Sequence, residues 1–227
     1  MTPPAPAPAS DAAALPPLVV WGAGGHARVV SASVRRAGRW RVAGFIDDQD
    51  PARAGEAFAG ATVLGGRAAL DALRAEGVVH LHLAFGHNAV RRRLAVELAH
   101  AGFLFPTLAD PLSLVADDAS LGDGCFVGPG AVVNAGARLG RQVIVNTGAI
   151  VEHDAVVGDA APLPRRACPA GHVHVGPATF IGAGAVVRDR VRIGAGCTIG
   201  LGSVVVRDLP DGVLAYGCPA TPHGNLP

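Results

Sequence analysis

Residues 127–158 read VGPGAVVNAGARLGRQVIVNTGAIVEHDAVVG, and an aliphatic residue returns at every sixth position of this stretch. Extended from Val115 to Val205, the series holds Val, Leu or Ile at fifteen of its sixteen positions, and Pro169 is the exception. Only 25 of the 91 residues in this window are Val, Leu or Ile. Chance would therefore place only about four of them on the series. Neither a helix nor an ordinary strand has a period of six residues.

A six-residue repeat is typical of a parallel β-helix, in which each repeat forms one short strand and a turn. The residue four places after each aliphatic anchor is most often Ala, which is small enough to point into a narrow interior. Three repeats would close one triangular coil of about eighteen residues, so the window holds about five coils. Gly or Asn follows many anchors and suits the corners, because these residues tolerate a positive φ.

A different pattern precedes the repeats and predicts a βαβαβ unit. Strands are expected at 18–21, 41–48, 78–85 and near Phe103, with helices ending near Ala37 and spanning 66–76 and 88–101. This α/β region ends near Pro106 and amounts to half of a dinucleotide-binding fold, which favours a mononucleotide ligand.

The turn between the first strand and the first helix, Gly22-Ala23-Gly24-Gly25-His26, is rich in glycine. Glycines let the backbone approach a phosphate, and a helix N-terminus adds N–H donors and positive potential. Asp47 and Asp48 end the next strand and suit ribose hydroxyls or base N–H groups. The alternative is a glycine turn that only packs a helix on a strand.

Composition limits the classes of function. The 227 residues are 50% apolar and carry a net charge of +1, which predicts neither a polyanion partner nor nucleic-acid binding. We expect a Pro/Ala-rich tail (1–17), an α/β domain (18–108), a β-helix (109–220) and a C-terminal tail (221–227). The first segment has no signal-peptide pattern, and nothing is apolar enough to span a membrane, so we expect a soluble, cytoplasmic protein. Cys125 and Cys197 lie four predicted coils apart, too far for a disulfide.

In the order of these pieces, with Phe45-Ile46-Asp47-Asp48 and Gly86-His87-Asn88 before the repeats, the chain resembles the PglD/NeuD-type bacterial sugar acetyltransferases. The resemblance covers residues 18 to about 220 and implies a left-handed β-helix, acetyl-CoA as co-substrate, no metal, and a homotrimer with its pockets between subunits. It implies N-acetylation of a UDP- or GDP-linked 4-amino sugar in glycan biosynthesis, or O-acetylation of sialic acid. It also implies roles for residues of the first domain: Gly22, Gly24, Gly25, Asp47 and Asp48 hold the nucleotide, His26 lies near the sugar, and Asn88 and Arg91 complete the pocket.

The candidate catalytic group is His153, in the sequence Val151-Glu152-His153-Asp154. Acetyl transfer from a thioester needs a base for the acceptor proton, and an imidazole suits that task. By resemblance, Asp154 is the acid that orients His153. Gly171 lies one predicted coil beyond His153, where its N–H could stabilise the oxyanion, a role that the resemblance also assigns. The alternative is a solvated corner histidine.

One segment departs from the family pattern. Where the family has a second histidine that contacts the acetyl donor, this chain has Pro162, followed by Pro164-Arg165-Arg166 and by Pro169. Proline removes N–H donors from a parallel ladder, so we expect missing bonds here. Either the turn is specialised, with the arginines meeting CoA phosphates, or the segment is damaged.

Two other classes of function remain open. His153, His172 and His174 could bind zinc between subunits, as in a γ-carbonic-anhydrase-like enzyme, although the last two are also typical of inert, solvent-facing residues. The proline-rich coil is compatible with a non-catalytic nucleotide-sugar-binding protein.

Overall fold

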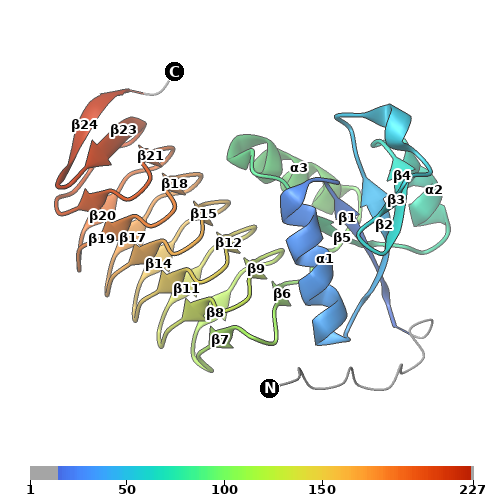
Figure 1. The fold of residues 1–227 in the computed structure, drawn as a ribbon, viewed down its shortest axis with the longest axis horizontal. Helices are drawn as coiled ribbons and strands as arrows, with labels where there is room; N and C mark the ends of the chain where they lie inside the picture. Colours follow the sequence, from blue (N-terminus) through green and yellow to red (C-terminus); the bar gives the residue numbers. More distant parts are fainter. Residues whose placement is uncertain (1–14, 226–227) are drawn as a thin grey trace, which may run out of the picture.

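The computed structural model describes residues 15–225, which form an α/β domain followed by a long β-helix (Figure 1). Its coils are stacked away from the α/β domain, and a C-terminal hairpin lies at the far end. Most of the predicted N-terminal tail, residues 1–14, lies outside the described residues, as do residues 226–227. No described helix is long and apolar enough to cross a membrane.

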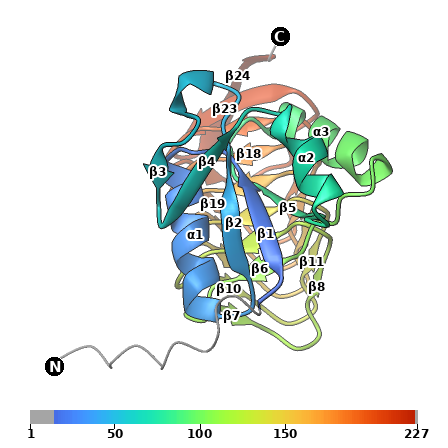
Figure 2. The same cartoon turned by 90° about the vertical axis from the view of Figure 1, so that its right-hand side faces the viewer.

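The N-terminal domain is a five-stranded sheet between two layers of helices (Figure 2). Its elements are β1 (Pro17–Trp21), α1 (Gly25–Ala37), β2 (Arg41–Ile46), the 3-10 helix η2 (Pro51–Arg53), β3 (Ala57–Phe58), β4 (Ala61–Gly65), α2 (Ala69–Ala75), β5 (His80–Leu83) and α3 (Asn88–His100). The strand order is β3-β4-β2-β1-β5, and only β3 is antiparallel to its neighbour. Leu18 and Val20 pack toward α1, whereas Val19 packs toward α2 and α3, because strand residues alternate in direction.

This arrangement confirms the predicted βαβαβ unit and adds to it. The β3–β4 hairpin was not predicted. The short strand expected near Phe103 is only an isolated bridge between His80 and Leu104.

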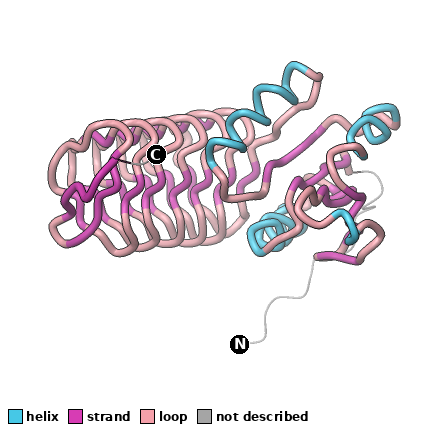
Figure 3. The backbone as a smooth tube through the Cα atoms, turned by 90° about the horizontal axis from the view of Figure 1, so that it is seen from above, coloured by secondary structure: helices cyan, strands magenta, loops and turns pink. Residues whose placement is uncertain are grey.

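The β-helix has three faces, seen as parallel rungs in Figure 3. The β6 face comprises β6 (Leu108–Ala109), β9 (Phe126–Val127), β12 (Ile144–Val145), β15 (Pro162–Leu163), β18 (Phe180–Ile181) and β21 (Thr198–Ile199). The β7 face comprises β7 (Leu114–Val115), β10 (Val132–Val133), β13 (Ile150–Val151), β16 (Cys168–Pro169), β19 (Val186–Val187) and β22 (Val204–Val205). The β8 face comprises β8 (Ser120–Leu121), β11 (Arg138–Leu139), β14 (Val156–Val157), β17 (His174–Val175) and β20 (Arg192–Ile193).

The coil register matches the predicted length. Val133 pairs with Val115 on one side and Val151 on the other, eighteen residues away in each direction. The aliphatic anchors and the small residues that follow them form one continuous buried core. Cys125 and Cys197 belong to this core, and the cysteines of the chain are free thiols.

The corner conformation differs from the expectation for glycine. From Leu121 to Ile199, a positive φ occurs three residues after each position of the series, for example at Gly130 and Gly136, and not directly after it. The glycines that directly follow anchors have another reason. A Cβ on Gly122 would lie 2.7 Å from the backbone of Gly140, and one on Gly176 would lie 2.5 Å from that of Ala195. Glycine at these positions therefore allows the next coil to approach closely.

The proline-rich coil keeps its register but interrupts two ladders. Ile144 pairs with Pro162, and Cys168 pairs with Val186, so no residue is gained or lost. The β6 face divides between β15 and β18, and the β7 face divides between β13 and β16. Pro162 and Pro164 have no N–H to donate to the next coil between β15 and β18. Between β13 and β16 the N–H groups of Ile150 and Glu152 still donate to the carbonyls of Ala167 and Pro169. The predicted loss of coil bonds is confirmed between β15 and β18.

The C-terminal segment was predicted wrongly as a tail. β23 (Val213–Gly217) continues the β6 face beside β21, and β24 (Ala220–Asn225) turns back antiparallel to it. Residues 221–225 therefore belong to a strand. The hairpin gives the last coil a hydrogen-bonded neighbour at its open edge.

The N-terminal domain packs on the β6 face. The outward side chains of Leu108, Phe126 and Ile144 join a buried cluster with Ala27 and Val30 of α1. The three faces make the β-helix a triangular prism, so one corner of the prism lies opposite each face. The corner opposite the β6 face, between the β7 and β8 faces, carries residues 153–154 and stays uncovered by this domain.

Candidate active site

His153 and Asp154 form an exposed pair at that corner. His153 Nδ1 lies 2.9 Å from Asp154 Oδ2, and both side chains are about half exposed. The hydrogen bond that His153 donates to Asp154, helped by the charges of Asp154, Glu152 and Asp189, raises the pKa of His153, although partial desolvation opposes it. The same hydrogen bond holds the pKa of Asp154 below its ordinary value. With Nδ1 held by a carboxylate, Nε2 is the nitrogen that can accept a proton.

Gly171 lies against that nitrogen. A Cβ on Gly171 would stand 2.7 Å from Nε2 and Cε1 of His153. The Gly171 N–H has no acceptor among the described residues, whereas its carbonyl accepts from the N–H of Arg190. The stacking predicted from the sequence brings Gly171 to His153, and a free N–H beside the base suits a developing oxyanion.

His172 extends the site on the same coil as Gly171. Its ring lies edge-on to the His153 ring with centroids 5.2 Å apart, and its Nε2 is 3.9 Å from Asp154 Oδ2. The sequence analysis favoured an inert role for this residue. His153, Asp154 and His172 could together offer ligand atoms to a metal, but His174, which the zinc alternative required, lies outside this group.

Asp154 and His172 both have a positive φ, of 57° and 55°. The equivalent corner position one coil below is Gly136. A side chain in this conformation costs about 1 kcal/mol relative to glycine. Other side chains share this conformation at equivalent positions, namely Gln142, Ala160, Arg166, Ala178 and Arg190, so the corners accept side chains as well as glycine.

A second candidate site lies at the carboxyl ends of β1, β2 and β5. A cavity of about 360 Å³ is lined there by Trp21, Gly22, Ile46, Asp47, Asp48, Gln49, Phe85, Gly86, His87, Val90 and Leu94. Ligands of open α/β sheets bind at this edge of the sheet. Three residues singled out from the sequence, Gly22, Asp47 and Asp48, lie here with Gly86 and His87 of the quoted Gly86-His87-Asn88 motif, while Phe85 was not foreseen.

The two aspartates have different surroundings. Asp47 is buried, with Oδ2 paired to Arg53 Nη1 at 2.6 Å and Oδ1 accepting from the N–H of Gln49. Asp48 is exposed and accepts only from the N–H of Arg67, at 2.6 Å. Asp47 therefore stabilises the turn, and Asp48 keeps acceptor capacity for a ligand.

The glycines of the first turn also differ. Gly22 has φ +119°, and a Cβ there would lie 2.7 Å from the Ala84 carbonyl oxygen, so the sheet itself requires glycine. Gly24 and Gly25 are exposed with open space around them, and they begin α1 without an acidic side chain in its first turn. This helix N-terminus is open to an anion.

The remaining three predicted residues of the first domain lie at its junction with the β-helix. The Arg91 guanidinium is buried and donates to the carbonyls of Phe85, Gln142 and Ala160. Asn88 donates to the carbonyl of Ala178 at 3.4 Å. His26 packs edge-on to Phe126, and burial together with the charge of Arg91 lowers the pKa of His26 to about 4. These contacts join the two domains, and contact with a sugar stays a prediction for all three.

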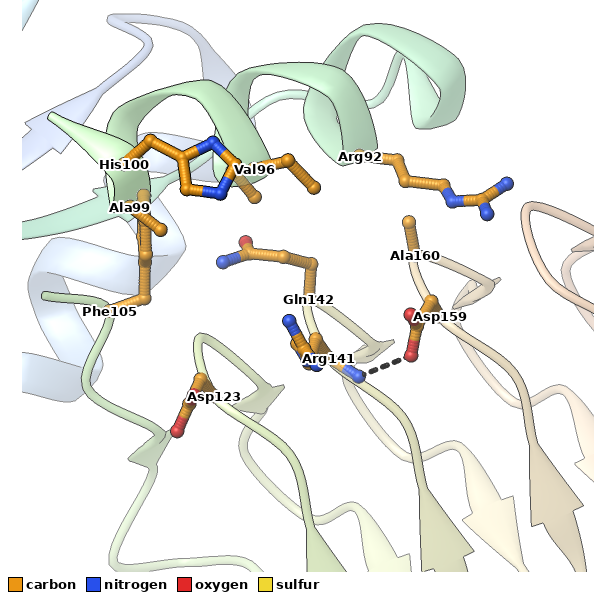
Figure 4. Close-up of a pocket in the computed structure, with 11 residues that line it drawn as sticks. Arg92, Val96, Ala99, His100, Phe105, Asp123, Arg141, Gln142, Asp159 and Ala160 are labelled. Atoms are coloured by element: carbon orange, nitrogen blue, oxygen red, sulfur yellow. Dashed lines mark hydrogen bonds between the residues drawn. The ribbon is translucent and has the colours of Figure 1, made fainter. Parts of the chain in front are cut away.

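A further cavity, of about 210 Å³, separates α3 from the coil corners beneath it (Figure 4). Arg92, Val96 and His100 project from α3, opposite Gln142 and Asp159 of the β-helix. The N–H of Arg141 donates to the Asp159 carboxylate at 2.9 Å. None of the residues singled out from the sequence lines this cavity.

The first part of the proline-rich coil lies away from the His153 corner, whereas the Pro169 carbonyl accepts from the N–H of Glu152, next to His153. Pro162 is buried on the β6 face, on the far side of the prism from His153. Arg165 and Arg166 are exposed at the corner between the β6 and β7 faces. Their contact with CoA phosphates stays a prediction.

Family models match both parts of the chain. The PglD N-terminal domain matches residues 17–98, and the bacterial transferase hexapeptide, with six repeats, matches residues 172–207. No curated protein is significantly similar to the chain.

Solved structures are similar over nearly the whole chain. A mutant of perosamine N-acetyltransferase from Caulobacter crescentus, solved with CoA and GDP-perosamine, is 41% identical. The alignment covers 92% of this chain and 97% of that one, with a TM-score of 0.87. The acetyltransferase domain of PglB from Neisseria gonorrhoeae, solved with acetyl coenzyme A, is 36% identical over 92% and 99% of the two chains, with a TM-score of 0.84.

Proposed function

Because the chain belongs to the hexapeptide-repeat sugar N-acetyltransferases with a PglD-type N-terminal domain, we propose that it transfers acetyl from acetyl-CoA to the amine of a nucleotide-linked 4-amino sugar. The observation that carries the proposal is the His153–Asp154 pair, with His153 Nε2 turned toward Gly171. A solvated corner histidine would not need a carboxylate on one nitrogen and a glycine against the other. Acetyl-CoA as donor is consistent with the cytoplasmic location expected from the sequence.

In this reaction the acceptor ammonium first releases one proton to water. The amine then attacks the thioester carbonyl carbon, so that a C–N bond forms, and His153 Nε2 accepts a second proton from the nitrogen. The Gly171 N–H stabilises the oxyanion of the tetrahedral intermediate. The C–S bond breaks, and His153 returns its proton to the thiolate. The products are the amide, CoA thiol and one proton.

The nucleotide binds at the carboxyl edge of the N-terminal sheet in this proposal. Asp48 accepts hydrogen bonds from the base or ribose, and the open start of α1 at Gly24 and Gly25 receives a phosphate. The Caulobacter relative was solved with GDP-perosamine, so we favour a GDP-linked sugar and keep a UDP-linked sugar as the second possibility.

The nucleotide cavity and His153 of one chain lie on different sides of the prism. The domain with the cavity packs on the β6 face, and His153 occupies the opposite corner. The β7 face, which leads to that corner, presents apolar side chains outward, including Leu114, Ile150 and Val186. Apolar outward side chains suit a protein interface. We therefore propose a homotrimer in which each site combines His153 of one subunit with the nucleotide cavity of another.

A panel of acceptors tests the activity. Purified protein is incubated with acetyl-CoA and GDP-perosamine, UDP-linked 4-amino sugars or free sialic acid, and thiol release and product mass are recorded. We expect a mass gain of one acetyl group on a nucleotide-linked amino sugar. Acetylation of sialic acid alone would favour the O-acetyltransferase alternative, and tight binding of nucleotide sugars without turnover would favour a binding protein.

Mixing two inactive variants tests the shared site. His153→Ala lacks the base, and Asp48→Ala weakens the nucleotide cavity. Mixed trimers unite an intact cavity with an intact base at some interfaces, so activity returns after the two variants are mixed under exchange. If each site belonged to one chain, the mixture would stay inactive.

A further inference from the structure

Two acceptor groups from different coils converge on Gly171. A Cβ on Gly171 would stand 2.7 Å from His153 Nε2 and 2.9 Å from Asp189 Oδ1. The two atoms are therefore no farther apart than the sum of these distances. At such a separation a single nitrogen atom can lie within ordinary hydrogen-bonding distance of both. We call this space, bounded by His153, Gly171 and Asp189, the Gly171 notch.

Asp189 is oriented with one oxygen toward the notch. Its Oδ2 lies 3.1 Å from Arg190 Nε, and its Oδ1 is the oxygen next to Gly171. The Asp189 side chain is 49% exposed, so a ligand can approach it. The corresponding position two coils nearer the α/β domain than Gly171 is Ala135. The fold does not require a carboxylate at this position of the corner.

The charge of the notch suits a cation. Asp154, Glu152 and Asp189 place negative charge around His153, and these three carboxylates outnumber the nearby guanidinium groups of Arg190 and Arg138. A sugar amine is mainly an ammonium group near neutral pH, whereas a sugar hydroxyl is neutral. A hydrogen bond between a carboxylate and an ammonium group is stronger than one between neutral groups.

The geometry points to Asp189 as the residue that binds the acceptor ammonium and so favours amino sugars over hydroxyl sugars. The inference rests on the proposed acetyl transfer and deepens it. Asp189 Oδ1 accepts one N–H of the ammonium and directs a second toward His153 Nε2, while the third proton is released to water. Asp189 keeps no proton, and His153 remains the base.

The test is Asp189→Asn, which retains the shape of the side chain and removes its charge. With GDP-perosamine as acceptor, we expect its KM to rise about tenfold while kcat changes less than about threefold. The KM for acetyl-CoA stays unchanged. The same nucleotide sugar with a hydroxyl in place of the amine serves as a competitive inhibitor, and its inhibition constant also stays unchanged.

Asp117→Asn is the matched control, because Asp117 is exposed at the same corner position two coils below His153. It should leave the KM for the amino sugar unaltered. Asp189→Glu retains the charge and should raise that KM less than Asp189→Asn.

Three outcomes decide the inference. An Asp189→Asn KM within twofold of the wild-type value would overturn it, as would an equal loss of affinity for the hydroxyl analogue. Both results presuppose an active wild-type enzyme and leave the proposed function intact. A wild-type protein that acetylates no amino sugar in the panel would instead refute the proposed function, and this inference with it.

Discussion

Histidines at two places in the molecule experience opposite environments. At the uncovered corner, a hydrogen bond with Asp154 raises the pKa of His153. At the junction of the two domains, burial, with smaller effects of the charges of His26 and Arg91, lowers the pKa of His82 to about 3. Burial and the charge of Arg91 lower that of His26 to about 4. The exposed corner therefore favours a protonated imidazole, whereas the junction holds its histidines neutral.

The largest expected effect is on catalysis at the corner. His153→Ala should lower kcat by about a thousandfold, since the general base is lost, while changing the melting temperature little because the side chain is exposed. His82→Phe, at the junction, should leave kcat within about threefold. Steady-state acetylation assays and thermal melts of both variants measure the two effects. An active His153→Ala variant would remove the contrast between the two places.

The next effect comes from the glycine beside the base. Gly171→Ala puts a methyl group 2.7 Å from His153 Nε2, so the ring must move or the acceptor is displaced. We expect kcat to fall about thirtyfold with an unchanged melting temperature. Kinetics of the single and double variants test the cause. In the His153→Ala background the same substitution should add nothing, and an additive loss would show that the methyl group acts elsewhere.

The junction histidines should make stability depend on pH. Their pKa values in the folded protein lie below the ordinary value of 6.5, so the unfolded chain binds more protons as the pH falls below 6.5. Between pH 7 and pH 5 each buried histidine should lower the free energy of unfolding by about 2 kcal/mol. Urea unfolding at the two pH values measures this loss.

Two substitutions test whether the histidines at the domain junction, and not other histidines, cause this loss of stability. His82→Phe should remove the part of this acid-induced loss of stability that His82 causes. His100→Phe should not, because the His100 side chain at the end of α3 is exposed. If the free energy of unfolding of His82→Phe fell as much between pH 7 and pH 5 as that of the wild type, His82 would be protonated in the folded protein. The contrast with His153 would then be wrong.

The repeat period predicted far more than the fold class. It set the coil register, placed Cys125 and Cys197 in the core and stacked Gly171 over His153. The same period relates Asp189 to His153, two coils apart, but only the orientation of its carboxylate distinguishes it from other corner acids. The contacts between the two domains could not be predicted from the sequence, because Arg91 donates to carbonyls on coils that are 51 and 69 residues away. The period also could not show that glycines after the anchors make room for the next coil.

The smallest expected effect is a shift in the pH profile. His153 must be neutral to accept a proton, so kcat/KM falls as the pH drops through its pKa. The hydrogen bond with Asp154 raises that pKa, and Asp154→Asn should therefore move this acid limb to lower pH while lowering the maximum rate. The acceptor amine titrates identically in both proteins, so the comparison isolates His153.

Glu152→Gln is the control. Glu152 accepts from the N–H of His153 and acts on the imidazole only through its charge, so the shift of the acid limb should be smaller in this variant. Equal shifts in the two variants would mean that net charge at the corner, and not the Asp154 hydrogen bond, sets the pKa of the base.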